Sequence, residues 1–148
     1  MFEIESRHPD EITIISKGTS IKFNIADATI DAGLEVGKIT GPGEFEIGEI
    51  GIRGIATENG HTIYDVEVGG VHVGIIGGIE ENLDDLVADV LCTYSVRAIR
   101  ELEPKLIVAM GNVDAMVTDL KLTARTEKKL KIKNRDSLPV AKEVVVLN

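Results

Sequence analysis

Residues 61–76, HTIYDVEVGGVHVGII, constrain the fold more than any other stretch of this chain. From His61 to Val68 polar and apolar residues alternate, as they do in a β-strand that buries one face. Gly69-Gly70 supplies a two-residue turn of the kind that needs positive φ, so the apolar run Val71–Ile76 should return antiparallel to the first strand. The stretch predicts a β-hairpin whose first strand has one solvent-facing side.

The rest of the chain divides into a strand-rich first half and a second half in which strands and helices alternate. Strands are predicted at residues 11–16 and 20–24, joined by a turn at Lys17-Gly18-Thr19, and along residues 45–53. Helices are predicted at residues 80–87, 94–102 and 113–120, and further strands at residues 89–92, 105–110, 128–133 and 143–147. This order predicts a mixed α/β (α+β) sandwich and not a doubly wound parallel sheet.

Length and charge limit the classes of protein that this chain can belong to. Its 148 residues are the size of one ordinary domain, so we expect a single domain over residues 1–148. With 25 acidic and 16 basic residues its formal charge is -9, which repels a phosphate backbone and disfavours nucleic acid as a partner. No apolar run reaches the roughly 20 residues that span a bilayer, and the first residues lack the features of a signal peptide. We therefore expect no membrane partner and a cytoplasmic location.

Several glycines lie where a phosphate-binding loop would lie, between a predicted strand and a predicted helix. They are Gly69-Gly70, Gly74 and Gly77-Gly78. Their spacing fits neither the dinucleotide-binding pattern nor the P-loop pattern, and Glu80 and Glu81 open the helix whose N-terminus would have to hold the anion. Nucleotide binding is therefore disfavoured.

The stretch ITGPGEFEIGEIGIRG carries two glutamates that could do chemistry. Glu44 and Glu46 are two residues apart, so in a strand both point to one face while Phe45 points to the other. Such a pair could act as acid and base or bind a hard metal ion. A solvated strand face is the commoner meaning of such a pattern, and we favour it.

The histidines and the cysteine form no recognisable site. His8, His61 and His72 are isolated, whereas a zinc site usually contains one closely spaced pair of ligands. His72 is expected to face Tyr64 or Glu67 across the hairpin and to have a packing role. Cys92 is the only cysteine, so no internal disulfide forms, and its apolar strand predicts a buried, inert thiol.

Taken in order, several segments resemble one known family. They are ITGPGEFEIGEIGIRGI, HTIYDVEVGGVHVGIIGG, ADVL, AIRELEPKLIVAM and SLPVAKEVVVLN. Together they cover residues 39–148 and are similar to the small bacterial Zn-dependent hydrolases of the metallo-β-lactamase superfamily. The resemblance implies an αββα sandwich of mostly antiparallel and mixed sheets with two to three helices, here in a shortened form.

The same resemblance implies where metal ligands would lie. The family binds one or two metal ions, zinc or another divalent metal, through an HxHxDH loop, an aspartate in an HLGD turn and a histidine in a PMHY segment. Residues 24–38 contain no counterpart of that loop, and Gly78 and Gly111 stand at the other two positions. The resemblance therefore predicts that the metal ligands are lost, with no catalytic residue, no metal-binding residue and no cofactor.

Three functions remain open at this point. The leading hypothesis is a non-catalytic remnant of the fold, a pseudoenzyme that acts by binding or self-assembly; a homo-oligomer, most simply a two-fold dimer, would cover the sheet face that the shortening leaves bare. The alternative is a metal-dependent (Zn) hydrolase with a site rebuilt from Glu44, Glu46, His61, Asp65 or His72. The third is a small-ligand binding module at the vacated edge, for which the sequence names no ligand.

Overall fold

The computed structural model describes residues 1–33, 36–111 and 113–148, and its strands form two stacked β-sheets. The first sheet has six strands in the order β13-β1-β2-β3-β4-β5, and every neighbouring pair is antiparallel. Its strands are β1 (Phe2–Glu5), β2 (Glu11–Ser16), β3 (Thr19–Asn24), β4 (Thr29–Asp31), β5 (Lys38–Thr40) and β13 (Leu130–Ile132).

The second sheet has eight strands in the order β12-β14-β11-β10-β9-β8-β7-β6. Its strands are β6 (Gly43–Ile47), β7 (Ile50–Ala56), β8 (Thr62–Val68), β9 (Val71–Gly77), β10 (Val90–Thr93), β11 (Leu106–Ala109), β12 (Ala124–Glu127) and β14 (Glu143–Leu147). Pairing is antiparallel from β6 to β9 and parallel from β9 to β12, so the sheet is mixed, as predicted.

The main hydrophobic core lies between the two sheets, where the apolar side chains of each alternating strand meet. Ile12 and Ile14 of β2 and Phe23 of β3 are fully buried there, opposite Val66 and Val73 of the other sheet. The predicted hairpins are confirmed: Gly69 and Gly70 join β8 to β9 with φ of 57° and 80°. The β2–β3 turn likewise has two left-handed residues, as the right-handed twist of paired strands requires.

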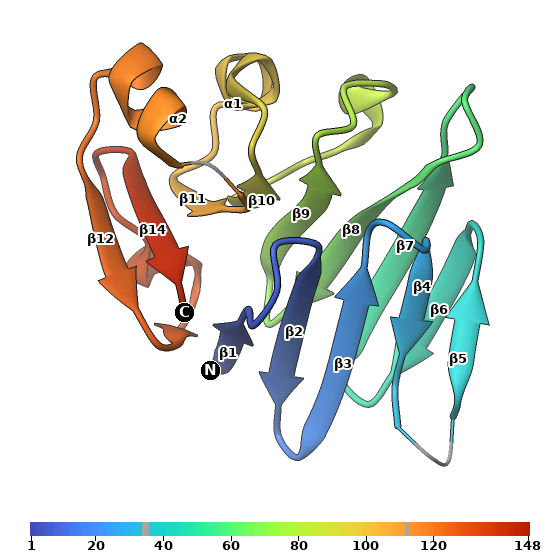
Figure 1. Ribbon diagram of the computed structural model, residues 1–148. Helices are drawn as coiled ribbons and strands as arrows, with labels where there is room; N and C mark the ends of the chain where they lie inside the picture. The colour runs from blue at the N-terminus through green and yellow to red at the C-terminus, as the bar shows by residue number, and fades with distance from the viewer. Residues whose placement is uncertain (34–35, 112) are drawn as a thin grey trace.

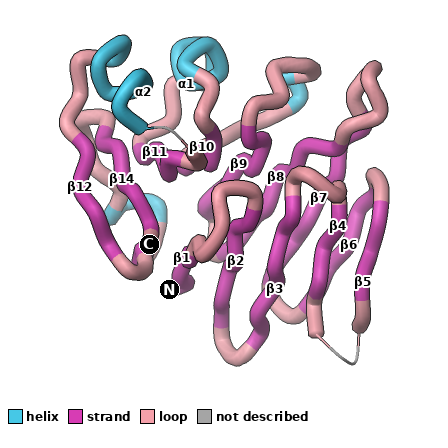
Figure 2. The backbone as a smooth tube through the Cα atoms, in the orientation of Figure 1, coloured by secondary structure: helices cyan, strands magenta, loops and turns pink. Residues whose placement is uncertain are grey.

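In the part of the chain that the structure describes, the α-helices cover one face of this sandwich. α1 (Val96–Leu102) and α2 (Val113–Leu120) pack a second apolar cluster onto the outer face of the eight-stranded sheet, beside β10, β11 and β14 (Figures 1 and 2). Within the described residues, no helix covers the outer face of the six-stranded sheet. The chain thus has three layers of an αββα sandwich, which is the truncated α/β architecture that the resemblance implies.

The outer face of the six-stranded sheet is polar, not apolar. One cross-strand row on it reads Thr13, Lys22, Asp31 and Lys38, in which positive and negative side chains alternate on neighbouring strands. The large hydrophobic side chains that are exposed, such as Val36, Val87 and Val140, are scattered over the described chain. In the described residues this face therefore offers no bare apolar surface, and the predicted two-fold dimer stays a prediction.

Three predicted elements differ from the structure. The strand predicted along residues 45–53 is two antiparallel strands, β6 and β7, joined by a turn at Gly48-Glu49. Residues 80–87 do not form a helix but contain only a 3-10 turn at Leu83–Asp85, because Asn82 is left-handed (φ 57°) and Leu86 returns to extended backbone. The predicted solvent-facing side of residues 61–68 is wrong for Ile63 and Asp65, which are buried. Glu67 is the exposed residue on that side of β8, and His61, just before the strand, is exposed as well. Strand periodicity could not predict this burial, because it is caused by the loop at residues 79–89. The loop folds back over this face and packs Leu83 and Leu86 against Ile63.

Four short strands have no counterpart in the prediction: β1, β4, β5 and β12. β4 and β5 lie within residues 24–38 and just beyond it, so this segment returns to the six-stranded sheet. Residues 34 and 35 of the segment lie outside the described residues. No helix in the described part of the chain is long and apolar enough to cross a bilayer.

Candidate functional site

Three neighbouring parallel strands end at one edge of the eight-stranded sheet and bring Gly78, Tyr94 and Gly111 together. Gly78 directly follows β9, Tyr94 follows β10, and Gly111 lies two residues after β11. A Cβ atom placed on Gly78 would lie 2.3 Å from the Tyr94 hydroxyl oxygen, and one placed on Gly111 would lie 3.7 Å from Tyr94 Cδ1. The Tyr94 ring therefore packs against both glycines, which are 33 residues apart in the sequence.

The backbone around Tyr94 is held by local hydrogen bonds. The Tyr94 N–H donates to the Gly77 carbonyl at 3.2 Å, and the Ser95 N–H donates to the Thr93 hydroxyl at 2.9 Å. Ser95 caps α1 by accepting from the Ala98 N–H at 3.1 Å. The ring is thus placed by the strand end on one side and by the helix start on the other.

These residues do not fit the metal ion that the resemblance implies. Glycine has no side-chain ligand, and a side chain at residue 78 would collide with Tyr94 unless the ring moved. In the parts of the chain that the structure describes, no three His, Cys, Asp or Glu side chains converge as a metal site would require. The equivalence of Gly78 and Gly111 with family ligands stays a prediction, but the space that ligand side chains would need holds an aromatic ring.

A cleft of about 570 Å³ opens beside this ring. Tyr94 is 52% exposed and forms part of its wall. The other polar side chains that line the cleft are Asp10, His61, Glu80, Glu81 and Arg97. Asn59 donates to one carboxylate oxygen of Glu81, and the other oxygen is buried without a hydrogen-bond partner in the described structure. The cleft therefore offers an aromatic face together with an acceptor that lacks a donor.

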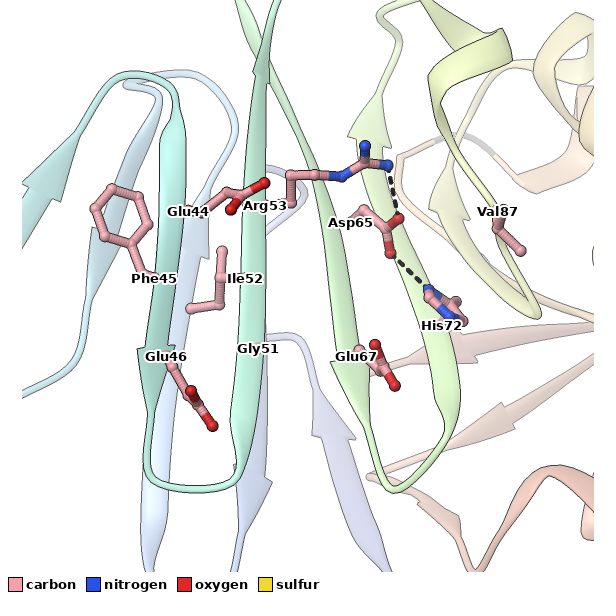
Figure 3. Close-up of a pocket in the computed structure, with 10 residues that line it drawn as sticks. All are labelled: Glu44, Phe45, Glu46, Gly51, Ile52, Arg53, Asp65, Glu67, His72 and Val87. Carbon is pink, nitrogen blue, oxygen red and sulfur yellow. Dashed lines mark hydrogen bonds and ion pairs between the residues drawn. The ribbon is translucent and has the colours of Figure 1, made fainter.

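A second hollow, a groove of about 520 Å³, lies on the outer face of the eight-stranded sheet over β6 to β9 (Figure 3). The strand register places Glu44, Arg53 and Asp65 in one cross-strand row. The next row contains Glu46, Gly51, Glu67 and His72. Because Gly51 has no side chain, the second row has a gap between Glu46 and Glu67, and this gap forms part of the floor of the groove.

Asp65 is the centre of the polar network in this groove. Its carboxylate is 8% exposed and lies 3.1 Å from Arg53 Nη2 and 3.0 Å from His72 Nδ1 (Figure 3). Arg53 also donates to the Asp85 carbonyl, and the His72 N–H donates to Asp89 Oδ2 at 2.9 Å. The network fastens the loop at residues 79–89 to β7 and β9.

The structure brings four of the five candidate ligands for a rebuilt metal site into this groove. Glu44, Glu46, Asp65 and His72 line it, whereas His61 lies in the cleft beside Tyr94. The prediction that Glu44 and Glu46 share a face is confirmed, since both side chains are exposed in the groove while Phe45 packs on the core. The Asp65 carboxylate, however, already pairs with Arg53 and His72 and would have to leave them to bind a metal ion.

The predicted partner of His72 is partly wrong. Glu67 is its register partner, as expected, but Tyr64 points to the opposite face of the sheet and packs against Phe23 with ring centroids 5.4 Å apart. The side chain that contacts His72 is Asp65. This contact could have been predicted from the residue spacing. Asp65 and Glu67 share one face of β8, so Asp65 is a diagonal neighbour of His72 and lies within reach of it.

The remaining candidates have no part in either hollow. His8 lies in the exposed turn before β2. Cys92 is fully buried, and burial raises the pKa of its thiol, which agrees with the prediction of an inert side chain.

Comparisons with known proteins identify the fold. No family model matches the chain, and no curated protein matches it significantly. A crystal structure from Thermotoga maritima matches with a TM-score of 0.74, covers 99% of both chains and shares 18% sequence identity; its description assigns it to the Zn-dependent hydrolases of the metallo-β-lactamase superfamily. This chain therefore has the metallo-β-lactamase fold over its whole length, as the resemblance implied.

Proposed function

We propose that this chain is a non-catalytic protein of the metallo-β-lactamase fold that acts by binding, and that the cleft beside Tyr94 is its binding surface. One observation carries the proposal: the Tyr94 ring packs against Gly78 and Gly111, at the edge where the resemblance locates metal ligands. A hydrolase of this fold would need ligand side chains there, unprotonated and convergent.

The cleft has the features of a small-ligand site. It lies beyond the carboxyl ends of parallel strands, where open sheets of this kind commonly bind ligands. Tyr94 offers an exposed ring face on which a flat group can stack, and Glu81 has a buried oxygen that a donor on the ligand would satisfy. A ligand with a planar part and a hydrogen-bond donor fits both.

The proposal is tested by metal content and by a ligand screen on the same preparation. Protein purified without chelator should contain much less than one zinc per chain. A thermal-shift screen of small planar amines and amides should find compounds that raise the melting temperature by mass action. Those shifts should vanish in Tyr94→Ala and persist in Val140→Ala, which changes an exposed side chain outside both hollows. One tightly held zinc per chain would overturn the proposal.

A rebuilt zinc hydrolase remains a second candidate because Glu44, Glu46, Asp65 and His72 line one groove. Zinc held there should be lost in His72→Ala and retained in His61→Ala, since His61 lies in the other hollow. Zinc that stays bound in both variants would argue against this groove as its site.

A further inference from the structure

The charge of this chain is divided very unevenly along the sequence. Residues 121–135 contain seven basic residues and one acidic residue, while the rest of the chain contains nine basic and 24 acidic residues. The two parts therefore carry net charges of +6 and −15, which add to the −9 of the whole chain. The basic residues of the segment are Lys121, Arg125, Lys128, Lys129, Lys131, Lys133 and Arg135.

The fold gathers this segment at one end of the sandwich, which we call the basic end. β12 is the edge strand of the eight-stranded sheet, and β13 is the edge strand of the six-stranded sheet. Between them lies a hollow of about 560 Å³ lined by Arg125, Glu127 and residues 128–131. Arg125 and Lys129 pair with carboxylates of their own chain. Lys128, Lys131 and Lys133 are exposed and have no ion-pair partner among the described residues.

The groove on the opposite part of the same sheet is the counterpart, and we call it the acidic end. β6 is the other edge strand of the eight-stranded sheet, farthest from β12 in the strand order. Glu44, Glu46 and Glu67 are exposed there, and within the described chain none of them has an ion-pair partner. Figure 1 shows β12 and β6 at the two far sides of the molecule.

We propose that the basic end binds the acidic end of a second copy of this chain. The charges of the two surfaces are complementary. The unpaired lysines of the basic end can form ion pairs with carboxylates, and the acidic end of every copy presents unpaired carboxylates. A nucleic acid is the weaker choice, because the remaining −15 of the chain would repel a second polyanion.

The placement of the two surfaces determines the kind of assembly. Because they are different surfaces at opposite edges of one sheet, the contact is head to tail and leaves one free surface at each end of the assembly. It is not the two-fold dimer expected from the sequence, and it does not involve the cleft beside Tyr94. Its success or failure is therefore independent of the proposed function.

Mass measurements on neutralised variants test this arrangement. At low ionic strength, sedimentation of the unaltered chain should show a mass that grows with concentration, and added salt should return it to one chain. Lys128→Gln/Lys131→Gln and Glu44→Gln/Glu46→Gln should each be monomeric alone. An equal mixture of the two should form a 1:1 pair and nothing larger, because it contains one intact surface of each kind. Circular dichroism checks that both variants are folded.

Lys22→Gln/Lys38→Gln is the matched control, since these exposed lysines lie on the outer face of the six-stranded sheet, and it should assemble like the unaltered chain. A monomer at every concentration and salt level would overturn the proposal. So would a neutralised variant that still assembles alone, or a mixture that stays monomeric. Binding of a duplex DNA probe by a chain that remains monomeric would assign the basic end to nucleic acid instead.

Discussion

The edge at Tyr94 and the groove at Asp65 show two different ways in which a polar site can be stabilised. At the edge, two positions have no side chain and a neighbouring aromatic ring occupies the space beside them. In the groove, a nearly buried carboxylate keeps two cationic or hydrogen-bonding neighbours. Steric filling stabilises the first region, and mutual satisfaction of polar groups stabilises the second.

The difference shows which region constrains the fold and which leaves room for binding. Asp65 connects β7, β8 and β9 and, through Arg53, the loop at residues 79–89. The Asp65 carboxylate already contacts Arg53 and His72, so little of its charge is available to a ligand. Tyr94 covers its glycines with one part of the ring and exposes about half of its surface, which leaves a face for a partner.

The largest effect is expected from Asp65→Ala in the groove. Removing the carboxylate leaves Arg53 and His72 without their partner, and the free energy of unfolding should fall by about 2 to 3 kcal/mol, below the cost of a fully buried pair because Arg53 is partly exposed. Urea unfolding measures it. Glu67→Ala is the control on the same face of β8, and it should change stability by less than about 0.5 kcal/mol. Equal effects of the two substitutions would contradict the structural role of Asp65.

A smaller loss of stability is expected at Gly78, where the Tyr94 ring fills the space beside the glycine. Gly78→Ala should cost about 1 to 2 kcal/mol, because its Cβ would collide with the Tyr94 ring, part of which can swing toward solvent. In a Tyr94→Ala background the same substitution should cost less than about 0.5 kcal/mol. Chemical denaturation of the four proteins of this cycle gives the coupling. If Gly78→Ala lowers the free energy of unfolding equally in both backgrounds, the Tyr94 ring does not occupy the space beside Gly78.

Gly111→Ala separates filling from backbone strain. A Cβ there would meet Tyr94 at 3.7 Å, an ordinary contact, but its φ of +90° disfavours any other residue. It should cost about 1 kcal/mol whether or not Tyr94 is present. The two glycines therefore give opposite results in the same double-mutant experiment.

The elements that depend on neighbouring residues in the sequence could be predicted. Those that depend on contacts with distant segments could not. The hairpins at residues 11–24 and 61–76 follow from alternation and from turn residues with positive φ. β4 and β5 are three residues long and rely on neighbouring strands for their hydrogen bonds. The acids at the start of residues 80–87 favoured a helix, but the loop is held instead by tertiary bonds such as Asn82 to the Ala56 carbonyl.

The two candidate sites divide in the same way. The shared face of Glu44 and Glu46 follows from strand periodicity alone. Their approach to Asp65 and His72 requires the order of four strands, and the contact of Tyr94 with Gly78 requires that β9 and β10 be parallel neighbours. A glycine shows that a side chain is missing but carries no information about the group that fills its place.

Tyr64 gives the fourth test, and its expected effect at pH 7 is the smallest, because it carries a buried polar group that has no hydrogen-bond partner in the described structure. It precedes Asp65 on β8 and faces the core, where its hydroxyl has no hydrogen-bond partner in the described structure. Tyr64→Phe removes only that hydroxyl, so it should leave stability at pH 7 unchanged or raise it by about 1 kcal/mol. A loss of more than about 1 kcal/mol would show that the hydroxyl is bonded.

The same residue should make the protein sensitive to alkali. Burial raises the pKa of Tyr64 from 10.0 to about 12, so between these values the unfolded chain releases a proton that the folded chain retains. The free energy of unfolding should therefore decrease as pH rises through this range, by at most about 2 to 3 kcal/mol. Tyr64→Phe should lose this decrease and keep the part due to the buried Cys92 thiol, whose pKa is also raised. Urea unfolding at about pH 9, 10 and 11 measures the slopes of Tyr64→Phe and of the unaltered chain. Identical slopes would show that water reaches the Tyr64 ring more than its packing implies.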